Sequence, residues 1–501
     1  MKRWILVAAW GLAAQLGATE TDERAARVRA ALPELDKMYA QLAEKEHIPG
    51  LVYGVVLDGK LIHWGGTGFA NQEDKVAATR HSLFRVASMT KNFVAMAALK
   101  LRDEGKLRLD DPVVKYLPEL RHAKLPTSDS TPVTVGMLLT MTTGLPEDNP
   151  WGDRQMARSN AEIEKLLGKG LSFASAPGTS FEYSNLGYIM LGKVVSKASG
   201  MRYQDYITRK ILLPLGMTST TWEYSKIPAD KLALGYHWLN NAWVREPILP
   251  DGDGAAMGGL ISSIDDYGRF VAFHLSAWPA RDGAETGPLK RASVRELHMP
   301  RAFAGLNQVE PVAGQQGARP MTSFYAYGLT WRRDARGNTL VGHSGGLPGY
   351  GSQYWFAPEQ GVGIMAFGNL RYAPVYRPTE TALRTLIERA GLYKAPPAAT
   401  PVLLARQQQV AQLVQGWDEQ LGNDIAAENF FLDRSRAEWI KHAAAQLDKI
   451  GKVVSVGPIK PENALRGSFP LVGERGTLNV WFSLSPESDP KVQALELRLQ
   501  N

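Results

Sequence analysis

The chain has 501 residues, and its 44% of hydrophobic and 21% of charged side chains are typical of a folded globular protein rather than a disordered one. The net charge of +7 is slight for this length, and the chain contains no basic run or arginine-rich stripe, which argues against nucleic-acid binding. The absence of cysteine excludes disulfide bonds and a lipid-anchored cysteine, and the nine histidines show no paired ligand spacing. We therefore expect no metal and no cofactor.

The N-terminus has the features of a signal peptide, which we expect to span residues 1–18. Lys2 and Arg3 precede an apolar run of about a dozen residues, too short to cross a bilayer but suited to a signal peptide's central region. Cleavage is expected near Ala18, although Leu16 is an imperfect residue at the third position before the cut. The alternative to a signal peptide is a buried N-terminal segment. No later stretch is long and apolar enough to span a membrane. An exported protein, periplasmic or secreted, is the prediction.

Residues 19–394 are predicted to form one α+β domain, an antiparallel sheet flanked by helices with an inserted helical lobe. Strands are expected at both ends of this region and helices between them, so distant segments must pair to close the sheet. The expected elements are an amphipathic helix at 20–46, a hairpin at 51–57 and 60–64 around Asp58-Gly59, a helix opened by Ser88, a mostly helical region to about 220, and strands from about 258 to 375 that include 327–331, 353–356 and 363–367.

A proline- and alanine-rich linker at 395–401 is expected to precede a separate small α+β domain at 402–501. The pattern of this domain loosely resembles the cone-shaped domains of the nuclear-transport-factor-2-like (NTF2-like) superfamily, without a motif. Its expected elements are helices at 402–420 and 434–450 and strands at 451–455, 478–482 and 492–497.

Ser88 and Lys91 place a hydroxyl and an amine three residues apart at the start of a helical pattern. Residues i and i+3 share a helix face, so the amine can reach the hydroxyl, and a helix N-terminus supplies free N–H groups where an anion forms. A serine nucleophile can be activated in this way without a histidine base. A Ser-x-x-Lys match arises by chance about once or twice in a chain this long, so the pair needs support from elsewhere.

A second match, Ser488 and Lys491, lies in a proline- and charge-rich turn where no helix aligns the two side chains. We interpret Ser488 and Lys491 as ordinary surface residues.

Tyr183-Ser-Asn185 is the only Tyr-x-Asn of the chain, and it follows the loop that starts at Pro177. A phenol beside a cation can lose its proton below its usual pKa of about 10 and act as a base. The amide of Asn185 can bond both an amine and a substrate amide. Taken alone, such a tripeptide is usually just part of a loop.

The third element is Gly342-His343-Ser344-Gly345-Gly346, between two strand-like segments. The glycines allow a ligand to approach the strand backbone closely and expose an N–H for an oxyanion. His343 can orient a substrate carboxylate or the tyrosine, or it can be an ordinary structural histidine.

Together these three elements, in this order, resemble the active-site motifs of the serine β-lactamase and penicillin-binding-protein superfamily, in its class C-like branch. The resemblance covers about residues 35–390 and includes Leu83-Phe-Arg-Val-Ala-Ser88 and Pro177-Gly-Thr. It implies that Ser88 is the acylated nucleophile, that Lys91 and Tyr183 share the general base and acid work, and that Asn185 holds Lys91 and the substrate. It also implies an oxyanion hole built from the N–H groups of Ser88 and Gly346, with His343, Ser344 and Gly345 on the substrate-binding strand.

His343 departs from the pattern, since many β-lactamases of this branch have a Lys there. A fixed positive charge favours a carboxylate, whereas His is mostly neutral near pH 7. The chain also has no Ser-Asp-Asn motif, which argues against the class A arrangement. The expected substrates are therefore short esters, D-amino-acid peptides and β-lactams, in that order.

Two alternatives remain open from the sequence. Gly342 to Gly346 also fits Gly-x-Ser-x-Gly, the nucleophile elbow of α/β-hydrolases, which would make Ser344 the nucleophile; that elbow needs a helix directly after the serine, and Leu347-Pro-Gly cannot start one. The other alternative is a penicillin-binding sensor that is acylated with little turnover and signals through the C-terminal domain.

Overall fold

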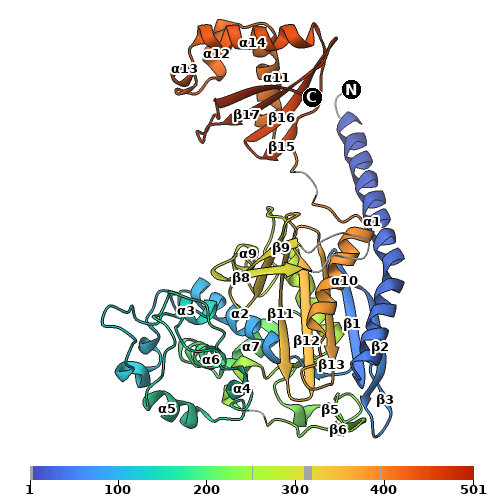
Figure 1. The fold of residues 1–501 in the computed structure, drawn as a ribbon, viewed down its shortest axis with the longest axis vertical. Coiled ribbons are helices and arrows are strands. Elements are labelled where there is room, and N and C mark those ends of the chain that lie inside the picture. Colours follow the sequence, from blue (N-terminus) through green and yellow to red (C-terminus); the bar gives the residue numbers. More distant parts are fainter. Residues whose placement is uncertain (1–3, 251, 310–318, 395–396, 501) are drawn as a thin grey trace. The chain divides into compact units, whose positions relative to one another are not determined.

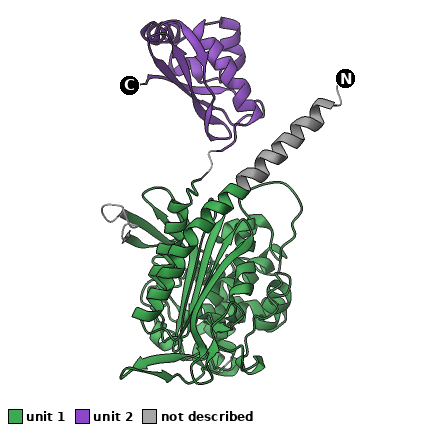
Figure 2. Ribbon diagram, turned by 90° about the vertical axis from the view of Figure 1, so that its right-hand side faces the viewer, with its two compact units in different colours: residues 1–393 green, residues 394–501 purple. Residues whose placement is uncertain are grey.

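The computed structural model describes residues 4–250, 252–309, 319–394 and 397–500, with the side chains of residues 4–21, 308, 309 and 319 outside the description. The chain divides into two compact units, residues 1–393 and 394–501 (Figure 2). The expected signal peptide at 1–18 falls mostly on the described backbone of the first helix, α1 (Trp4–Lys45). Among the described residues, no helix combines the length and the apolar character that a membrane crossing requires.

Unit 1 is built on a nine-stranded antiparallel sheet with the order β3-β2-β1-β13-β12-β11-β10-β9-β8 (Figure 1). β1 pairs with β13, for example Leu51 with Gly368, so strands from both ends of the unit lie side by side and close the sheet as the sequence predicts. The described strands of unit 1, within this sheet or outside it, are β1 (Gly50–Leu57), β2 (Lys60–Asn71), β3 (Val76–Ala77), β4 (Phe84–Arg85), β5 (Tyr236–Leu239), β6 (Ala242–Arg245), β7 (Ile261–Ser262), β8 (Ala302–Val309), β9 (Arg319–Tyr325), β10 (Thr330–Asp334), β11 (Thr339–Leu347), β12 (Tyr350–Ala357) and β13 (Val362–Gly368).

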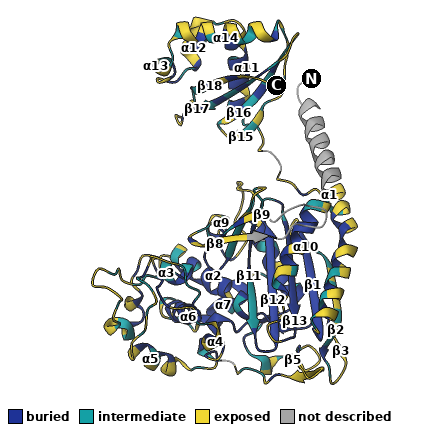
Figure 3. Cartoon of the chain, viewed as in Figure 1, coloured by how far each residue is buried: buried dark blue, intermediate teal, exposed yellow. Residues whose placement is uncertain are grey.

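Both faces of the central strands are covered, because every residue of β1, β12 and β13 is buried (Figure 3). Side chains alternate between the faces of a strand. Val52 and Val56 accordingly belong to the core that the sheet shares with the helical lobe, whereas Leu51 and Val55 belong to the core under α1 and α10. The helices of the unit besides α1 include α2 (Thr90–Asp103), α3 (Val135–Thr140), α4 (Asn149–Gly152), α5 (Asn160–Gly168), α6 (Asn185–Ser199), α7 (Tyr203–Ile207), α8 (Ile264–Ser276), α9 (Arg291–Leu297) and α10 (Tyr376–Arg389).

Three sequence-based expectations need correction in unit 1. Ser88 does not open the α-helix itself; it lies in a 3-10 turn, η1 (Ala87–Met89), and α2 begins at Thr90. The expected strand at 327–331 starts only at Thr330, because Gly328 has a φ of +67° that breaks the extended chain. The region expected to hold strands after 258 also contains α8 and α9. The hairpin at Asp58-Gly59 is confirmed, and both turn residues have positive φ.

The described part of unit 2 combines four helices with a sheet of order β14-β16-β17-β18, in which β15 pairs with β16. The sequence predicted the first and last helices and three of the strands, but it missed α12, α13, β15 and β16. The expected linker at 395–401 ends inside structure, because Pro401 is already the first residue of α11. The elements are α11 (Pro401–Gln415), α12 (Glu419–Ile425), α13 (Phe430–Asp433), α14 (Arg436–Ile450), β14 (Val453–Val456), β15 (Lys460–Asn463), β16 (Arg466–Gly473), β17 (Thr477–Leu484) and β18 (Val492–Leu499).

The spare Ser-x-x-Lys pair lies in this unit, just before β18. Lys491 Nζ donates to Asp424 O at 2.7 Å and pairs with Asp489 at 3.0 Å. Its amine is thus engaged with groups other than Ser488, as expected for a surface turn.

A buried histidine pair ties α8 to the C-terminal end of α9. Trp278 Nε1 donates to His298 Nδ1 at 2.9 Å, so His298 carries its proton on Nε2 and donates to His274 Nδ1 at 2.7 Å. Burial lowers the pKa of His274 to about 3 and, with the charges of His274 and Arg295, holds the pKa of His298 well below its ordinary value. Both rings are therefore neutral in the folded protein.

This pair predicts a specific acid sensitivity. The folded pKa of His274 lies below its ordinary 6.5, so its contribution to stability is complete above pH 6.5 and is lost as the pH falls from 6.5 toward 3. His274→Leu loses the bond to His298 and is therefore less stable than the wild type at pH 7.5. Between pH 6.5 and 5, however, its free energy of unfolding falls less steeply, and the two slopes differ by about 1.4 kcal/mol per pH unit. Denaturant unfolding across this range measures the slopes. The exposed His122→Leu serves as the control with a wild-type slope, and parallel wild-type and His274→Leu curves would contradict the prediction.

Candidate active site

Ser88 lies where the short strand β4 turns into η1, and its side chain is partly exposed. The preceding residue, Ala87, has a φ of +48°, a left-handed conformation that costs on the order of 1 kcal/mol for a residue with a side chain. The turn is held in place from two sides: Val86 N donates to Leu260 O at 3.0 Å, and Ser352 Oγ donates to Val86 O at 2.8 Å. The surrounding sheet therefore fixes a strained turn that presents the hydroxyl.

Lys91 follows one turn later and is completely buried. Its Nζ lies 2.9 Å from Ser88 Oγ, 2.7 Å from Asn185 Oδ1 and 2.6 Å from Met257 O. Burial lowers its pKa from 10.5 to about 7, although the carboxylates of Asp153 and Asp148 act in the opposite direction. A substantial share of the amine is therefore neutral near pH 7, and a neutral amine can accept a proton.

The three partners of Lys91 also fix the direction of its lone pair. Asn185 Oδ1 and Met257 O can only accept hydrogen bonds, so a neutral amine donates its two N–H groups to them. The remaining tetrahedral position, the lone pair, then faces Ser88 Oγ. This geometry makes Lys91 suited to take the proton of the serine hydroxyl.

Asn185 is the first residue of α6 and is positioned by the cap of that helix. Ser184 Oγ accepts from Gly187 N at 3.1 Å, and the Asp148 carboxylate accepts from the N–H groups of Asn185 at 2.6 Å and Leu186 at 2.9 Å. The amide of Asn185 donates to Asn149 Oδ1 at 3.1 Å. One N–H of the amide remains to contact a substrate.

Tyr183 lies beside this pair, with Lys91 Nζ 4.9 Å from its ring centroid. Burial raises the pKa of Tyr183 above its ordinary value, and a hydrogen bond with the Ser88 side chain offsets this only in part. The expectation that the neighbouring cation lets the phenol ionise easily is therefore wrong for the free protein. Desolvation, together with Tyr188, Asp153 and Asp148, outweighs the hydrogen bond with Ser88, and Tyr183 is a neutral phenol that can donate a proton.

His343 is buried on β11 and is neutral as well. Its Nε2 lies 3.0 Å from the hydroxyl of Tyr325 and its Nδ1 lies 2.6 Å from Ser344 O. Because a carbonyl accepts only, Nδ1 carries the proton and Nε2 accepts from Tyr325. Burial, followed by the charge of Lys91, lowers the pKa of His343 to about 3. Both ring nitrogens are engaged, and the ring lies 6.1 Å from that of Tyr183, so His343 supports the strand and packs beside Tyr183.

The edge of β11 approaches the serine turn through Gly345. A Cβ on Gly345 would lie 2.2 Å from Val86 O, so only glycine allows the strand to lie this close to the turn. β10 pairs with β11 only as far as Gly342, and among the described strands none covers the following edge. The two-residue turn after Leu347 closes on the Leu347–Tyr350 pair, so the alternation of antiparallel bonding directs the N–H of Gly346 toward the open edge.

Ser344 does not meet the requirements of a nucleophile elbow. It lies inside β11 opposite Gln353, and the residues after the strand form the β11–β12 turn and then β12. An elbow needs a strand, a sharp turn at the serine and a helix. The alternative assignment of the nucleophile to Ser344 is therefore not supported by its surroundings.

Asp153 and Tyr372 complete the site and were missed from the sequence. The Tyr372 hydroxyl donates to Asp153 Oδ2 at 2.8 Å, its N–H donates to Leu347 O at 3.2 Å, and a Cβ on Gly346 would lie 2.9 Å from its ring. Tyr372 has a φ of +49° and is 48% exposed. Its ring thus forms a wall beside Gly346, held by both the sheet and the helical lobe.

Other contributions were also invisible in the sequence. Asp148 and Asn149 precede a proline, which indicates only a turn, and Met257 contributes through its backbone oxygen. Among the described residues, no cluster of three or more histidine or acidic side chains could hold a metal ion.

The β-lactamase family model matches residues 35–389 of the chain. "Protein flp" of Staphylococcus aureus strain N315 is 30% identical over 350 residues, which are 68% of this chain and 64% of that protein, so the chain spans less than two thirds of that relative. "Penicillin-binding protein 4*" of Bacillus subtilis is 27% identical over 334 residues, 63% of this chain and 67% of the relative.

Among solved structures, the octameric penicillin-binding protein homologue from Pyrococcus abyssi aligns with a TM-score of 0.58 and 23% identity, covering 92% of this chain and 93% of that one. This likeness concerns the fold. The family match over most of unit 1 shows that the chain belongs to the β-lactamase family, within the superfamily of serine β-lactamases and penicillin-binding proteins.

Proposed function

We propose that the protein is a serine hydrolase that forms an acyl-enzyme on Ser88. The family supports serine acyl-enzyme chemistry in general. The observation that carries the assignment to Ser88 is the contact of 2.9 Å with Lys91, a buried amine whose pKa burial lowers to about 7 and whose lone pair faces the hydroxyl. A base with a pKa near the working pH is the most effective one.

In the proposed acylation step, Ser88 Oγ attacks the substrate carbonyl carbon while Lys91 takes the hydroxyl proton. The negative charge that develops on the carbonyl oxygen is stabilised by the N–H groups of Ser88 and Gly346. When the bond to the leaving group breaks, Tyr183 donates its proton to that group and regains one from the ammonium of Lys91. Both residues then return to their starting protonation states.

In the proposed deacylation step, a water molecule attacks the ester carbon of the acyl-enzyme. Lys91 accepts a proton of the water, the bond to Ser88 Oγ breaks, and Ser88 regains a proton from the ammonium of Lys91. The acid product leaves, and the site is ready for another cycle.

The charges of the site support uncharged substrates. His343 is neutral and engaged by Tyr325 and Ser344, so no fixed positive charge lies at this position of β11 to bind a carboxylate. Asp148 and Asp153 add negative charge near Lys91. The proposed substrates are therefore small esters first, D-amino-acid peptides or amides second, and β-lactams third.

The central test is the effect of Ser88→Ala on labelling and turnover. We expect this variant to lose fluorophosphonate labelling and to hydrolyse p-nitrophenyl esters, D-alanyl peptides and nitrocefin at least about 10³-fold more slowly. Ser344→Ala, a matched loss of a hydroxyl from the neighbouring strand, should keep labelling and a measurable part of the activity. Activity that survives in Ser88→Ala would overturn the assignment. A labelled penicillin that stays bound for hours without turnover of any substrate would instead favour a sensor.

The pH profile tests the base. Lys91 accepts a proton only when it is neutral, so kcat/KM should fall about tenfold per pH unit below about 7 and level off above it. Lys91→Arg keeps a permanent charge and should lose at least about 10³-fold in kcat/KM at every pH. Lys100→Arg, on the same helix, provides the control and should keep the wild-type profile. A flat profile from pH 5 to 9 would exclude Lys91 as the base.

The wall formed by Tyr372 should control the size of the acyl group. Tyr372→Ala opens the space beside Gly346, and we expect the ratio of kcat/KM for p-nitrophenyl benzoate over p-nitrophenyl acetate to rise about fivefold to tenfold. Tyr372→Phe keeps the ring and loses only the bond to Asp153, so the ratio should stay within about twofold of the wild type. An unchanged ratio in Tyr372→Ala would contradict this role.

A further inference from the structure

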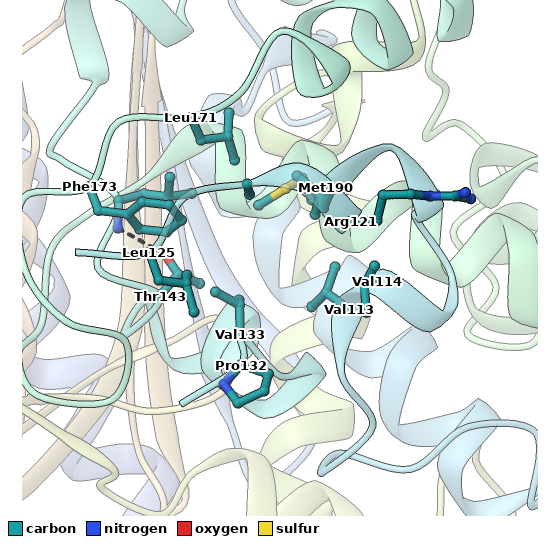
Figure 4. A pocket seen from close by; sticks show the side chains of 13 residues that line it. Val113, Val114, Arg121, Leu125, Pro132, Val133, Thr143, Leu171, Phe173 and Met190 are labelled. Carbon is teal, nitrogen blue, oxygen red and sulfur yellow. Dashed lines mark hydrogen bonds between the residues drawn. The ribbon is translucent and has the colours of Figure 1, made fainter. Parts of the chain in front are cut away.

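The helical lobe of unit 1 contains an apolar cavity of about 190 Å³ that is separate from the residues described above (Figure 4). Its walls come from segments far apart in the sequence, and Val113, Val133, Leu171, Phe173 and Met190 line it. An apolar cavity of about 150 Å³ is large enough to hold benzene. The size therefore suits a single aryl ring or a short alkyl chain.

The lining indicates the chemistry of the occupant. Thr143 and Arg121 are the only polar side chains of the lining. Thr143 Oγ1 accepts from Leu145 N at 3.2 Å, and Arg121 Nε donates to Pro118 O at 3.0 Å while its guanidinium extends away from the cavity (Figure 4). No charge or unpaired polar group of these two residues is aimed inward, so the lining favours an uncharged, apolar group.

Backbone hydrogen bonds join the segments that form the walls of the cavity. Val113 N donates to Val133 O at 2.8 Å, which joins two segments of the lining, and Ala174 N donates to Gly144 O at 2.8 Å, which joins the Phe173 segment to the loop of Thr143. These bonds oppose collapse of the walls into the cavity, which is therefore present before a ligand binds.

Two walls continue directly into the residues that position Asn185. Leu145 lies three residues before Asp148, whose carboxylate holds the N–H of Asn185 at 2.6 Å. Met190 lies on α6, the helix that begins at Asn185, and Asn185 Oδ1 accepts from Lys91 at 2.7 Å. A ligand that displaces either wall therefore acts on the partners of Lys91.

We propose that this cavity binds an uncharged aryl or alkyl group of a small molecule, and that its occupancy changes the turnover rate at Ser88. The proposed binding depends on the cavity alone, whereas the proposed change of turnover rate also rests on the proposed function. Coupling of this kind is reciprocal for binding, and it requires only a small shift of the α6 cap.

Binding is tested on the full chain with toluene as the probe and benzoate as its charged counterpart of similar size. We expect toluene to raise Tm with the logarithm of 1 + [toluene]/Kd, by about 1 °C at ten times its Kd, and benzoate to leave Tm unchanged. An equal effect of benzoate, or no rise of Tm with toluene, would overturn the proposal.

Two variants that fill the cavity, Ala123→Leu and Val133→Phe, locate the site. We expect each to reduce the toluene effect on Tm at least about fivefold, whereas Ala437→Leu, an exposed position of unit 2, keeps it. Because the two substitutions lie on different walls, the test remains possible if one of the two variants fails to fold. Toluene binding that persists in both folded variants would place the ligand elsewhere and refute the assignment.

Turnover gives the second readout. With saturating toluene, kcat for p-nitrophenyl acetate should change at least about twofold, with a midpoint equal to the Kd fitted from the Tm dependence. Ala123→Leu should abolish this change while keeping the basal rate within about twofold. Toluene binding without any change in kcat would refute the coupling. Absence of esterase activity in the wild type would count against the proposed function and leave the Tm test of binding intact.

Discussion

The site depends on one buried amine that lacks a carboxylate in direct contact. Lys91 is fully enclosed, and its three near partners are a hydroxyl, an amide oxygen and a backbone carbonyl. Burial in such surroundings disfavours the ammonium, whereas a direct ion pair would have kept the amine charged and useless as a base. The carbonyl of Met257 and the amide of Asn185 take both N–H groups of the neutral form. The only remaining direction points to Ser88, so the same contacts lower the pKa and aim the lone pair.

The rest of unit 1 serves to hold these partners, which come from three separate segments of the chain. The sheet closes by pairing β1 with β13, which places β11 and β12 against the turn of Ser88, and Gly345 allows the contact because a side chain would strike Val86 O. The lobe supplies Asn185 through the cap of α6, and η6 (Asp253–Met257) supplies the carbonyl. Strain at Ala87 is tolerated because strands on both sides fix the turn. The geometry is therefore a property of the whole fold rather than of a motif.

The sequence predicted the architecture and the motifs well because both leave local signals. Alternating and helical periodicities reveal the hairpin at Asp58-Gly59 and the closing strands, and spacing reveals Ser88 and Lys91. It failed where the cause is not local. The ionisation of Tyr183 was misjudged because its desolvation depends on the packed lobe, and Tyr372 reaches the site only through a left-handed turn after β13. Export, the NTF2-like character of unit 2 and the catalytic role of each site residue stay predictions.

The two nearby carboxylates explain why the pKa of Lys91 stays near 7 rather than falling lower. Desolvation alone would lower the pKa of Lys91 further, and Asp153 and Asp148 raise it back to about 7. Neither carboxylate is free to move: Asp148 is held by the first N–H groups of α6, and Asp153 by the hydroxyl of Tyr372. Burial also raises the pKa values of Asp148 and Asp153, because water solvates all three charged groups poorly in this cluster. The basicity of Lys91 thus depends on how closely Asp148 and Asp153 approach it, so a ligand that shifted the segment carrying them would act on Ser88 through Lys91.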